Sequence, residues 1–187
     1  MRGATFTLDI SLPRIGGAAG AVGGALWSLK VAIDGPRPGD GIADALFFLL
    51  PILFGAGLAA VYARYSGTMG GEGNAGFVQS FVGLVLLAAG LFTDLTLGME
   101  NTTRIVSFGF LILTLGLVLL GFAMLKIEPL PALNFLPLAL GLLTPLNILV
   151  GDAPFIQLAI SVVFGLGWLA LGTLVFLDRK EPGTKQV

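Results

Sequence analysis

The sequence predicts an all-α membrane protein, a compact bundle of six transmembrane helices joined by short loops. Of its 187 residues, 56% are apolar and only 11% are charged, whereas charged residues make up about 25% of a typical soluble domain. The mean hydropathy is +0.96. Six apolar stretches approach the roughly 20 residues that a helix needs to cross the bilayer core, and they leave no room for a soluble catalytic domain.

Turn residues and charges delimit the first three helices. We expect the first helix over residues 15–33, a glycine-rich stretch that ends before the turn segment 34–41. The second is expected over residues 42–65 and the third over residues 76–97. The segment 66–75 between them is rich in glycine, which permits sharp turns, and it is predicted to be a loop that lets the chain reverse.

The other three helices are delimited in the same way. We expect them over residues 105–125, 133–150 and 155–177. Pro137 and Pro145 lie inside the second of these. Because proline removes a backbone donor and clashes with the preceding turn, this helix is predicted to be kinked.

The basic residues predict which side of the membrane each end occupies. Six spans place the N-terminal arm at residues 1–14 and the basic tail at residues 178–187 on one side of the helical domain, residues 15–177. Because basic loops stay in the cytoplasm, a majority of seven basic residues to three predicts that both termini are cytoplasmic. The seven on the terminal side are Arg2, Arg14, Arg64, Lys126, Arg179, Lys180 and Lys185, and the others are Lys30, Arg37 and Arg104.

The arm has the pattern of a strand. Apolar side chains alternate with others at Phe6, Leu8, Ile10 and Leu12. This period places them on one side of an extended chain. The arm therefore either lies extended on the membrane surface or docks on another subunit.

The strongest local pattern is a glycine face in the first expected helix. Its members, spaced so that they share one side of the helix, are Gly16, Gly20, Gly24 and Trp27. In lipid, where the hydrophobic effect does not drive helices together, such small-residue faces are where helices associate. The partner helix lies either in this chain or in another. The same spacing recurs in the second expected helix, at Gly55, Ala59 and Ala63, so the two helices are candidates to pack together.

Asp94, in the third expected helix, is the acid that we expect to lie inside a span. An ionised carboxylate there is costly unless it is paired or reached by water. Lys30 is its expected partner, and Asp44 is a competing acid. Gln79 lies on the same helical stripe as Asp94. The group is a candidate cation or proton site; the alternatives are a structural ion pair and an aspartate solvated at the interface.

Short sequence matches recur between the two halves of the chain. They are Phe77-Val78-Gln79 with Phe155-Ile156-Gln157, Arg14-Ile15 with Arg104-Ile105, and Leu50-Pro51 and Gly55 with Leu136-Pro137 and Gly141. Three spans duplicated in opposite orientation, an architecture that many transporters use, would produce such matches. The alternative is chance similarity between apolar segments.

The missing residue types exclude much chemistry. The sequence has no histidine and no cysteine, which excludes thiolate and histidine-ligated metal sites, Ser-His-Asp triads and disulfides. We therefore expect no catalytic residues, no metal and no cofactor. A formal net charge of -1 gives no electrostatic reason to expect nucleic acid.

Two patches carry a family resemblance. The first helix ends with Gly23-Gly24-Ala25-Leu26-Trp27, and the last contains Gly165-Leu166-Gly167-Trp168-Leu169-Ala170-Leu171-Gly172 before a basic tail. In these patches and in its hydropathy, the chain resembles uncharacterised prokaryotic six-transmembrane-helix integral membrane proteins. The resemblance implies a multi-pass protein of the inner (plasma) membrane and supplies no catalytic residues.

Three functions fit these observations. The first is a non-catalytic accessory or assembly subunit of a membrane complex, or a homo-oligomer, with membrane lipids and other membrane subunits or itself as partners. The alternative is a small cation- or proton-coupled transporter or channel that uses Asp94. The third is an intramembrane enzyme. An aspartyl protease of the GxGD type is disfavoured because Val150-Gly151-Asp152 lacks the first glycine.

Overall fold

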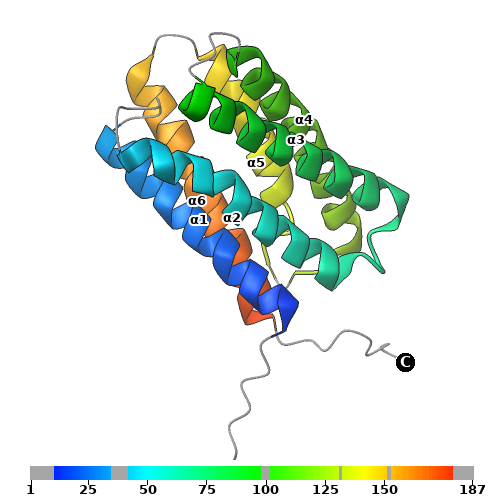
Figure 1. Cartoon of the computed structure of the whole chain (residues 1–187). Coiled ribbons are helices and arrows are strands. Elements are labelled where there is room, and N and C mark those ends of the chain that lie inside the picture. The colour runs from blue at the N-terminus through cyan, green and yellow to red at the C-terminus, as the bar shows by residue number, and fades with distance from the viewer. Residues whose placement is uncertain (1–10, 35–41, 98–101, 131, 151–152, 179–187) are drawn as a thin grey trace, which may run out of the picture.

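The computed structural model describes residues 11–34, 42–97, 102–130, 132–150 and 153–178, which fold into six α-helices (Figure 1). In chain order they are α1 (Leu12–Asp34), α2 (Ile42–Tyr65), α3 (Gly70–Leu97), α4 (Thr102–Ile127), α5 (Leu136–Leu149) and α6 (Pro154–Leu177). All of them except α5 are long and apolar enough to cross a membrane. These five helices indicate an integral membrane protein.

The third helix begins earlier than the sequence predicts. The segment 66–75 is not a loop throughout, because α3 starts at Gly70, whose positive φ of 64° marks the turn. The reason is packing against the end of α4. A Cβ atom on Gly73 would meet the side chains of Met69 and Ala123, so the absent side chain lets the first turn of α3 lie close to α4.

The fifth helix is shorter than predicted. It has 14 residues, about 21 Å at 1.5 Å per residue, against about 30 Å of hydrocarbon core. The chain before it turns instead of continuing as helix. The Asn134 side chain accepts a hydrogen bond from Leu130 N (2.8 Å) and donates one to Leu130 O (3.1 Å), and Leu133 has a positive φ of 62°. Leu130 itself is buried.

The helices form a closed ring. Each helix packs against the next along the chain, and α1 also packs against α6, so the first and last helices close the ring. In Figure 1, α1, α2 and α6 lie together on one side, with α3 and α4 on the other. The most extensive helix contacts are α3 with α4 and α1 with α6. We call the end where α1 begins and α6 ends the terminal end, and the opposite end the distal end.

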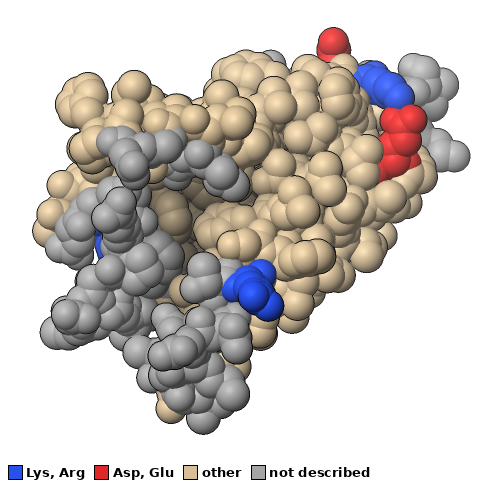
Figure 2. Space-filling model, turned by 90° about the horizontal axis from the view of Figure 1, so that it is seen from above, with Lys and Arg blue, Asp and Glu red and all other residues tan. Residues whose placement is uncertain are grey.

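The outside of the bundle is apolar as well as the inside. The core contains Phe54 stacked on Trp168, with ring centroids 4.6 Å apart. Many large apolar side chains remain on the surface, among them Val85, Phe108 and Phe155, which is 79% exposed. On the face seen in Figure 2 the charged side chains lie in separate groups, and the tan surface between the groups on the right carries none. A soluble protein rarely exposes so much apolar surface, whereas a bilayer solvates it.

Candidate functional site

The glycine face of α1 is divided between two neighbours in the same chain. A Cβ atom on Gly16 would clash with the backbone of Ala56, and one on Gly20 would lie 2.9 Å from the Cα atom of Gly57, so both glycines face α2. Gly24 faces α6, where an added Cβ would clash with the backbone of Leu169. The structure therefore places the face at contacts within the bundle.

Trp27, the fourth member of the predicted face, joins α1 to α6. Its indole Nε1 donates a hydrogen bond to Ser161 O (2.8 Å). The neighbouring Ser28 hydroxyl donates to Gly24 O (3.0 Å) and to Val162 O (3.3 Å). Polar bonds as well as close packing thus hold α1 against α6.

The first two helices do pack together, but not through the residues of α2 that carry the repeated spacing. Cβ atoms added to the α1 glycines would meet other α2 residues, namely Leu53, Phe54, Ala56, Gly57 and Ala60. A Cβ atom on Gly55 would meet only Phe81, at 3.7 Å, and Ala63 is exposed. The predicted stripe on α2 therefore lies beside the contact with α1, turned toward α3 and the outside.

The sequence analysis missed a second glycine-lined pair, formed by α3 and α4. A Cβ atom on Gly83 would lie 2.8 Å from Gly109 O, and one on Gly76 would lie 2.9 Å from Gly116 O. The helices approach backbone to backbone, as α1 and α6 do. The signal was a spacing of seven residues, which occurs at Gly76, Gly83 and Gly90 in α3, at Gly109 and Gly116 in α4, and at Gly17 with Gly24 and Gly165 with Gly172.

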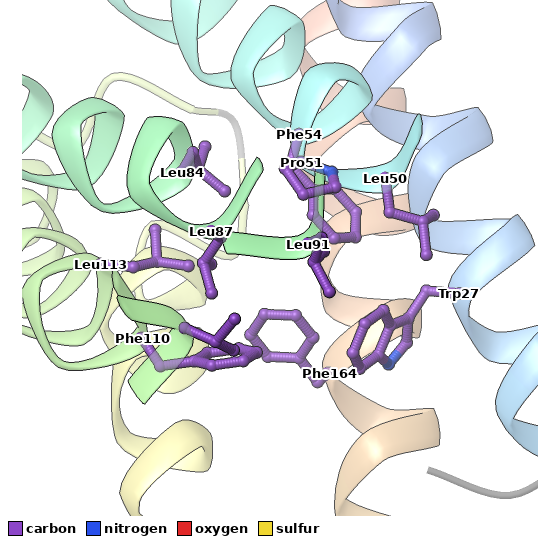
Figure 3. Close-up of a pocket in the computed structure, with 11 residues that line it drawn as sticks. Trp27, Leu50, Pro51, Phe54, Leu84, Leu87, Leu91, Phe110, Leu113 and Phe164 are labelled. Atoms are coloured by element: carbon purple, nitrogen blue, oxygen red, sulfur yellow. The ribbon is translucent and has the colours of Figure 1, made fainter. Parts of the chain in front are cut away.

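A cavity lies at the centre of the ring, toward the distal end (Figure 3). It has a volume of ≈ 40 Å³, and its lining side chains are all apolar or aromatic. They come from α1, α2, α3, α4 and α6, and they are Trp27, Leu50, Pro51, Phe54, Leu84, Leu87, Leu91, Val106, Phe110, Leu113 and Phe164. The lining is apolar: among these side chains only the Trp27 indole, which is hydrogen-bonded to Ser161 O, has a polar atom.

Lys30 lies one turn beyond the cavity residue Trp27 on α1 and is only 4% exposed. It has an interaction partner. Asp44 belongs to α2 and Asp94 to α3, but their side chains lie outside the described residues. The ion pair of Lys30 with either acid therefore stays a prediction. Gln79 is half-buried on α3, about 22 Å from Asp94 along the helix axis, which is too far for the two to share one ion.

Sequence reasoning also missed a polar cluster at the terminal end, which joins the end of α2 to the end of α6. Arg64, in the last turn of α2, lies with its Nε 3.3 Å from Asp178 Oδ2, and its Nη2 donates to Asp178 O (3.2 Å). The Tyr65 hydroxyl donates to the same carboxylate oxygen (2.7 Å). The arginine and aspartate side chains are 9% and 7% exposed. The sequence did contain a signal for this cluster: Arg64 and Asp178 have opposite charges and lie at helix ends that were predicted to be on one side of the membrane.

Within the described residues, no group of three or more aspartates, glutamates, histidines or cysteines is placed to hold a metal. Comparison with known proteins finds no match: no family model, no curated protein and no solved structure is similar to the chain.

Proposed function

We propose that the chain is a six-span protein of a prokaryotic inner membrane, with both termini cytoplasmic, in which α5 completes the bundle. The majority of basic residues on the terminal side supports this orientation. The place of α5 between α4 and α6 supports its membrane location. Irregular backbone at membrane depth is tolerated where protein covers it, and the buried Leu130 shows protein covering part of the segment before α5.

We further propose that α1–α3 and α4–α6 are halves of an inverted repeat. The two glycine-lined pairs support it, because they have one contact pattern. Each glycine of a pair lies against the carbonyl of its opposite glycine and against the residue four positions further on. The repeat equates Gly17 and Gly24 of α1 with Gly109 and Gly116 of α4, and both shift by the same number of positions. It equates Gly76 and Gly83 of α3 with Gly165 and Gly172 of α6, again by one constant shift. In this register Arg14 and Gln79 are not equivalent to Arg104 and Gln157, so the short sequence matches do not support the repeat.

The proposed function is that of a small membrane transporter without catalytic activity. The observation that carries it is the central cavity, which lies between two helix pairs of matching geometry. Substrate sites of transporters with inverted repeats lie at the interface between the repeats near the middle of the membrane. The apolar lining favours an apolar or amphiphilic substrate over a bare cation. The absence of histidine and cysteine supports a role other than catalysis.

The test is flux through vesicles that contain the purified protein. Val106→Phe places a larger side chain against the cavity, whereas Ile105→Phe makes the matched change at a neighbouring, 41% exposed position outside the lining. We expect wild-type vesicles to move fluorescent amphiphiles, and Val106→Phe, but not Ile105→Phe, to reduce the rate several-fold. No flux of amphiphiles, protons or common cations with wild-type protein would overturn the transporter proposal.

The same vesicles test cation or proton coupling at Asp94. Asp94→Asn keeps the size of the side chain but removes its charge. If Asp94 is the coupling site, the variant should fold and lose proton- or cation-driven uptake. Uptake that is unchanged in Asp94→Asn would exclude this acid from the mechanism.

A second candidate function is that of an accessory or assembly subunit, or of a homo-oligomer. The observation that favours it is the stripe on α2 that α1 leaves open, in particular the exposed Ala63. Small residues in lipid-facing positions allow another helix to approach closely. Gentle extraction from the native membrane should then recover a partner or a second copy, and Ala63→Phe should release it while Ala25→Phe, at an exposed position on α1, should not. Recovery of a monomer alone would exclude this role.

A further inference from the structure

We propose that a groove between α2 and α3 binds an acyl chain of a membrane lipid, and that it is the route by which such a chain reaches the central cavity. The second part rests on the proposed function, since it names the substrate class of that cavity. The first part does not depend on transport.

The groove is open, apolar and at membrane depth. Its volume is ≈ 370 Å³, and it lies within the spanning stretches Phe48–Tyr65 and Gly70–Thr93. Every side chain that lines it is apolar, and small residues form much of its α2 wall. The lining residues are Pro51, Ile52, Gly55, Ala56, Ala59, Phe81, Leu84, Val85 and Ala88. Because hydrocarbon is the medium beside these stretches in a bilayer, the groove faces lipid tails.

The shape of the groove favours a narrow chain over a helix. A helix needs its partner's backbone to be accessible at the small residues. Here the ring of Phe81 lies 3.7 Å from the position of a Cβ atom on Gly55, so it covers that glycine. Ile52 and Val85 are about half exposed and also line the groove. A helix with its side chains is about 10–12 Å across and would have to displace Phe81, whereas a flexible hydrocarbon chain can follow the groove around it.

The groove and the central cavity share a wall. Pro51 and Leu84 line both of them, so these two residues separate the lipid side from the centre of the ring. A protein docked on the outside would not need the groove to adjoin the cavity, whereas a lipid chain that moves inward would pass from the groove into the cavity at this wall. In Figure 3 the side chains of Pro51 and Leu84 lie beside the cavity, on α2 and α3 respectively.

The wall is built where the bundle can yield. Pro51 lies inside α2 and has no backbone N–H, so α2 lacks one helical hydrogen bond at the wall and bends more easily there. The contact of α2 with α3 is much less extensive than that of α3 with α4. The cavity of ≈ 40 Å³ is too small for a chain in this state, because an apolar cavity of about 150 Å³ holds a ligand no larger than benzene. Movement of Leu84 would join it to the groove.

Photolabelling tests the lipid site. The probe is phosphatidylcholine with a photoreactive diazirine in the middle of one acyl chain, in vesicles that contain the full-length protein. Ala88→Phe fills the groove, and Ala89→Phe makes the same change at the adjacent, exposed residue outside it. We expect labels to concentrate on the groove residues, to fall several-fold in Ala88→Phe and to stay unchanged in Ala89→Phe. Labels spread evenly over the lipid-facing surface, or crosslinks to a second protein chain at the groove, would overturn the lipid site.

Fluorescence quenching tests the inward route. Trp27 lines the cavity, and the other tryptophan, Trp168, is 1% exposed. Phosphatidylcholine brominated near mid-chain should quench Trp27, more strongly in Leu84→Ala and less in Ala88→Phe. If labelling succeeds but neither variant alters quenching, the lipid site stands and the route is wrong. If amphiphiles move across the vesicles but labelling fails, the lipid site is rejected and the proposed transport function stands. If labelling succeeds but no flux is seen, the transport function is rejected and the lipid site stands.

Discussion

The two sides of the ring are held together in different ways. On the side of α1, α2 and α6, polar bonds accompany the close packing: the Trp27 indole and the Ser28 hydroxyl reach carbonyls of α6, and Arg64 pairs with Asp178. The side of α3 and α4 has the same glycine packing. Its ion pair, Lys126 with Glu72, is exposed, with side chains 64% and 61% accessible. Backbone-to-backbone packing at glycines therefore holds both helix pairs together, and buried or partly buried polar bonds between helices add to it on the side of α1, α2 and α6.

The largest expected effect tests this shared backbone-to-backbone packing. Gly24→Leu and Gly83→Leu would each drive a side chain into the backbone of the opposite helix. Overpacking costs about 1–3 kcal/mol even where side chains can yield, and a backbone yields less. We expect both variants to lose most folded protein in detergent, to a similar extent. Ala25→Leu, at an exposed neighbour of Gly24, is the control, and melting in mild detergent is the measurement. If Gly83→Leu leaves the protein as stable as wild type, backbone-to-backbone packing does not hold α3 against α4 as it holds α1 against α6.

The next effect compares the two ion pairs. Asp178→Asn leaves Arg64 largely buried opposite a neutral group, and breaking a buried pair costs about 3–5 kcal/mol. We expect somewhat less, because the asparagine can still accept a hydrogen bond from Tyr65. Lys126→Ala removes an exposed pair, which is worth about 0–1 kcal/mol. Thermal unfolding of both variants checks this order. If both variants lose the same free energy of unfolding, the buried ion pair does not stabilise its side of the ring more than the exposed pair stabilises the other side.

A smaller effect is expected from the indole of Trp27. Trp27→Phe keeps an aromatic ring near Phe164, which lies edge-on at 5.7 Å, but removes the hydrogen bond to Ser161 O. A typical hydrogen bond contributes about 0.5–1.5 kcal/mol, and the smaller ring adds a packing loss. The free energy of unfolding should fall by about 1–2 kcal/mol. A variant as stable as wild type would show that this bond does not hold α1 on α6.

The sequence predicted most of the fold because hydropathy and turn residues mark helices independently of their neighbours. It failed where packing decides. The early start of α3 depends on Gly73 fitting against Ala123, and the late start of α5 depends on the turn closed by Asn134. Of the candidate site, the glycine face was recognisable from its spacing, but its division between α2 and α6 was not. The cluster of Arg64, Tyr65 and Asp178 joins residues far apart in the sequence, so only the ring closure of the helices reveals it.

The smallest effect compares two serines at equivalent close approaches. Ser28 lies at the contact with Gly165 and donates to two carbonyls, whereas Ser80 lies at the contact with Gly116 and its fully buried hydroxyl has no hydrogen-bond partner among the described residues. Ser28→Ala should therefore cost about 1 kcal/mol. Ser80→Ala should cost nothing or stabilise the protein, because removing a buried hydroxyl without a partner relieves its desolvation penalty. Parallel unfolding of the two variants measures the difference. If Ser80→Ala is the more damaging change, the hydroxyl has a partner in the membrane and the side of α3 and α4 is held by polar bonds after all.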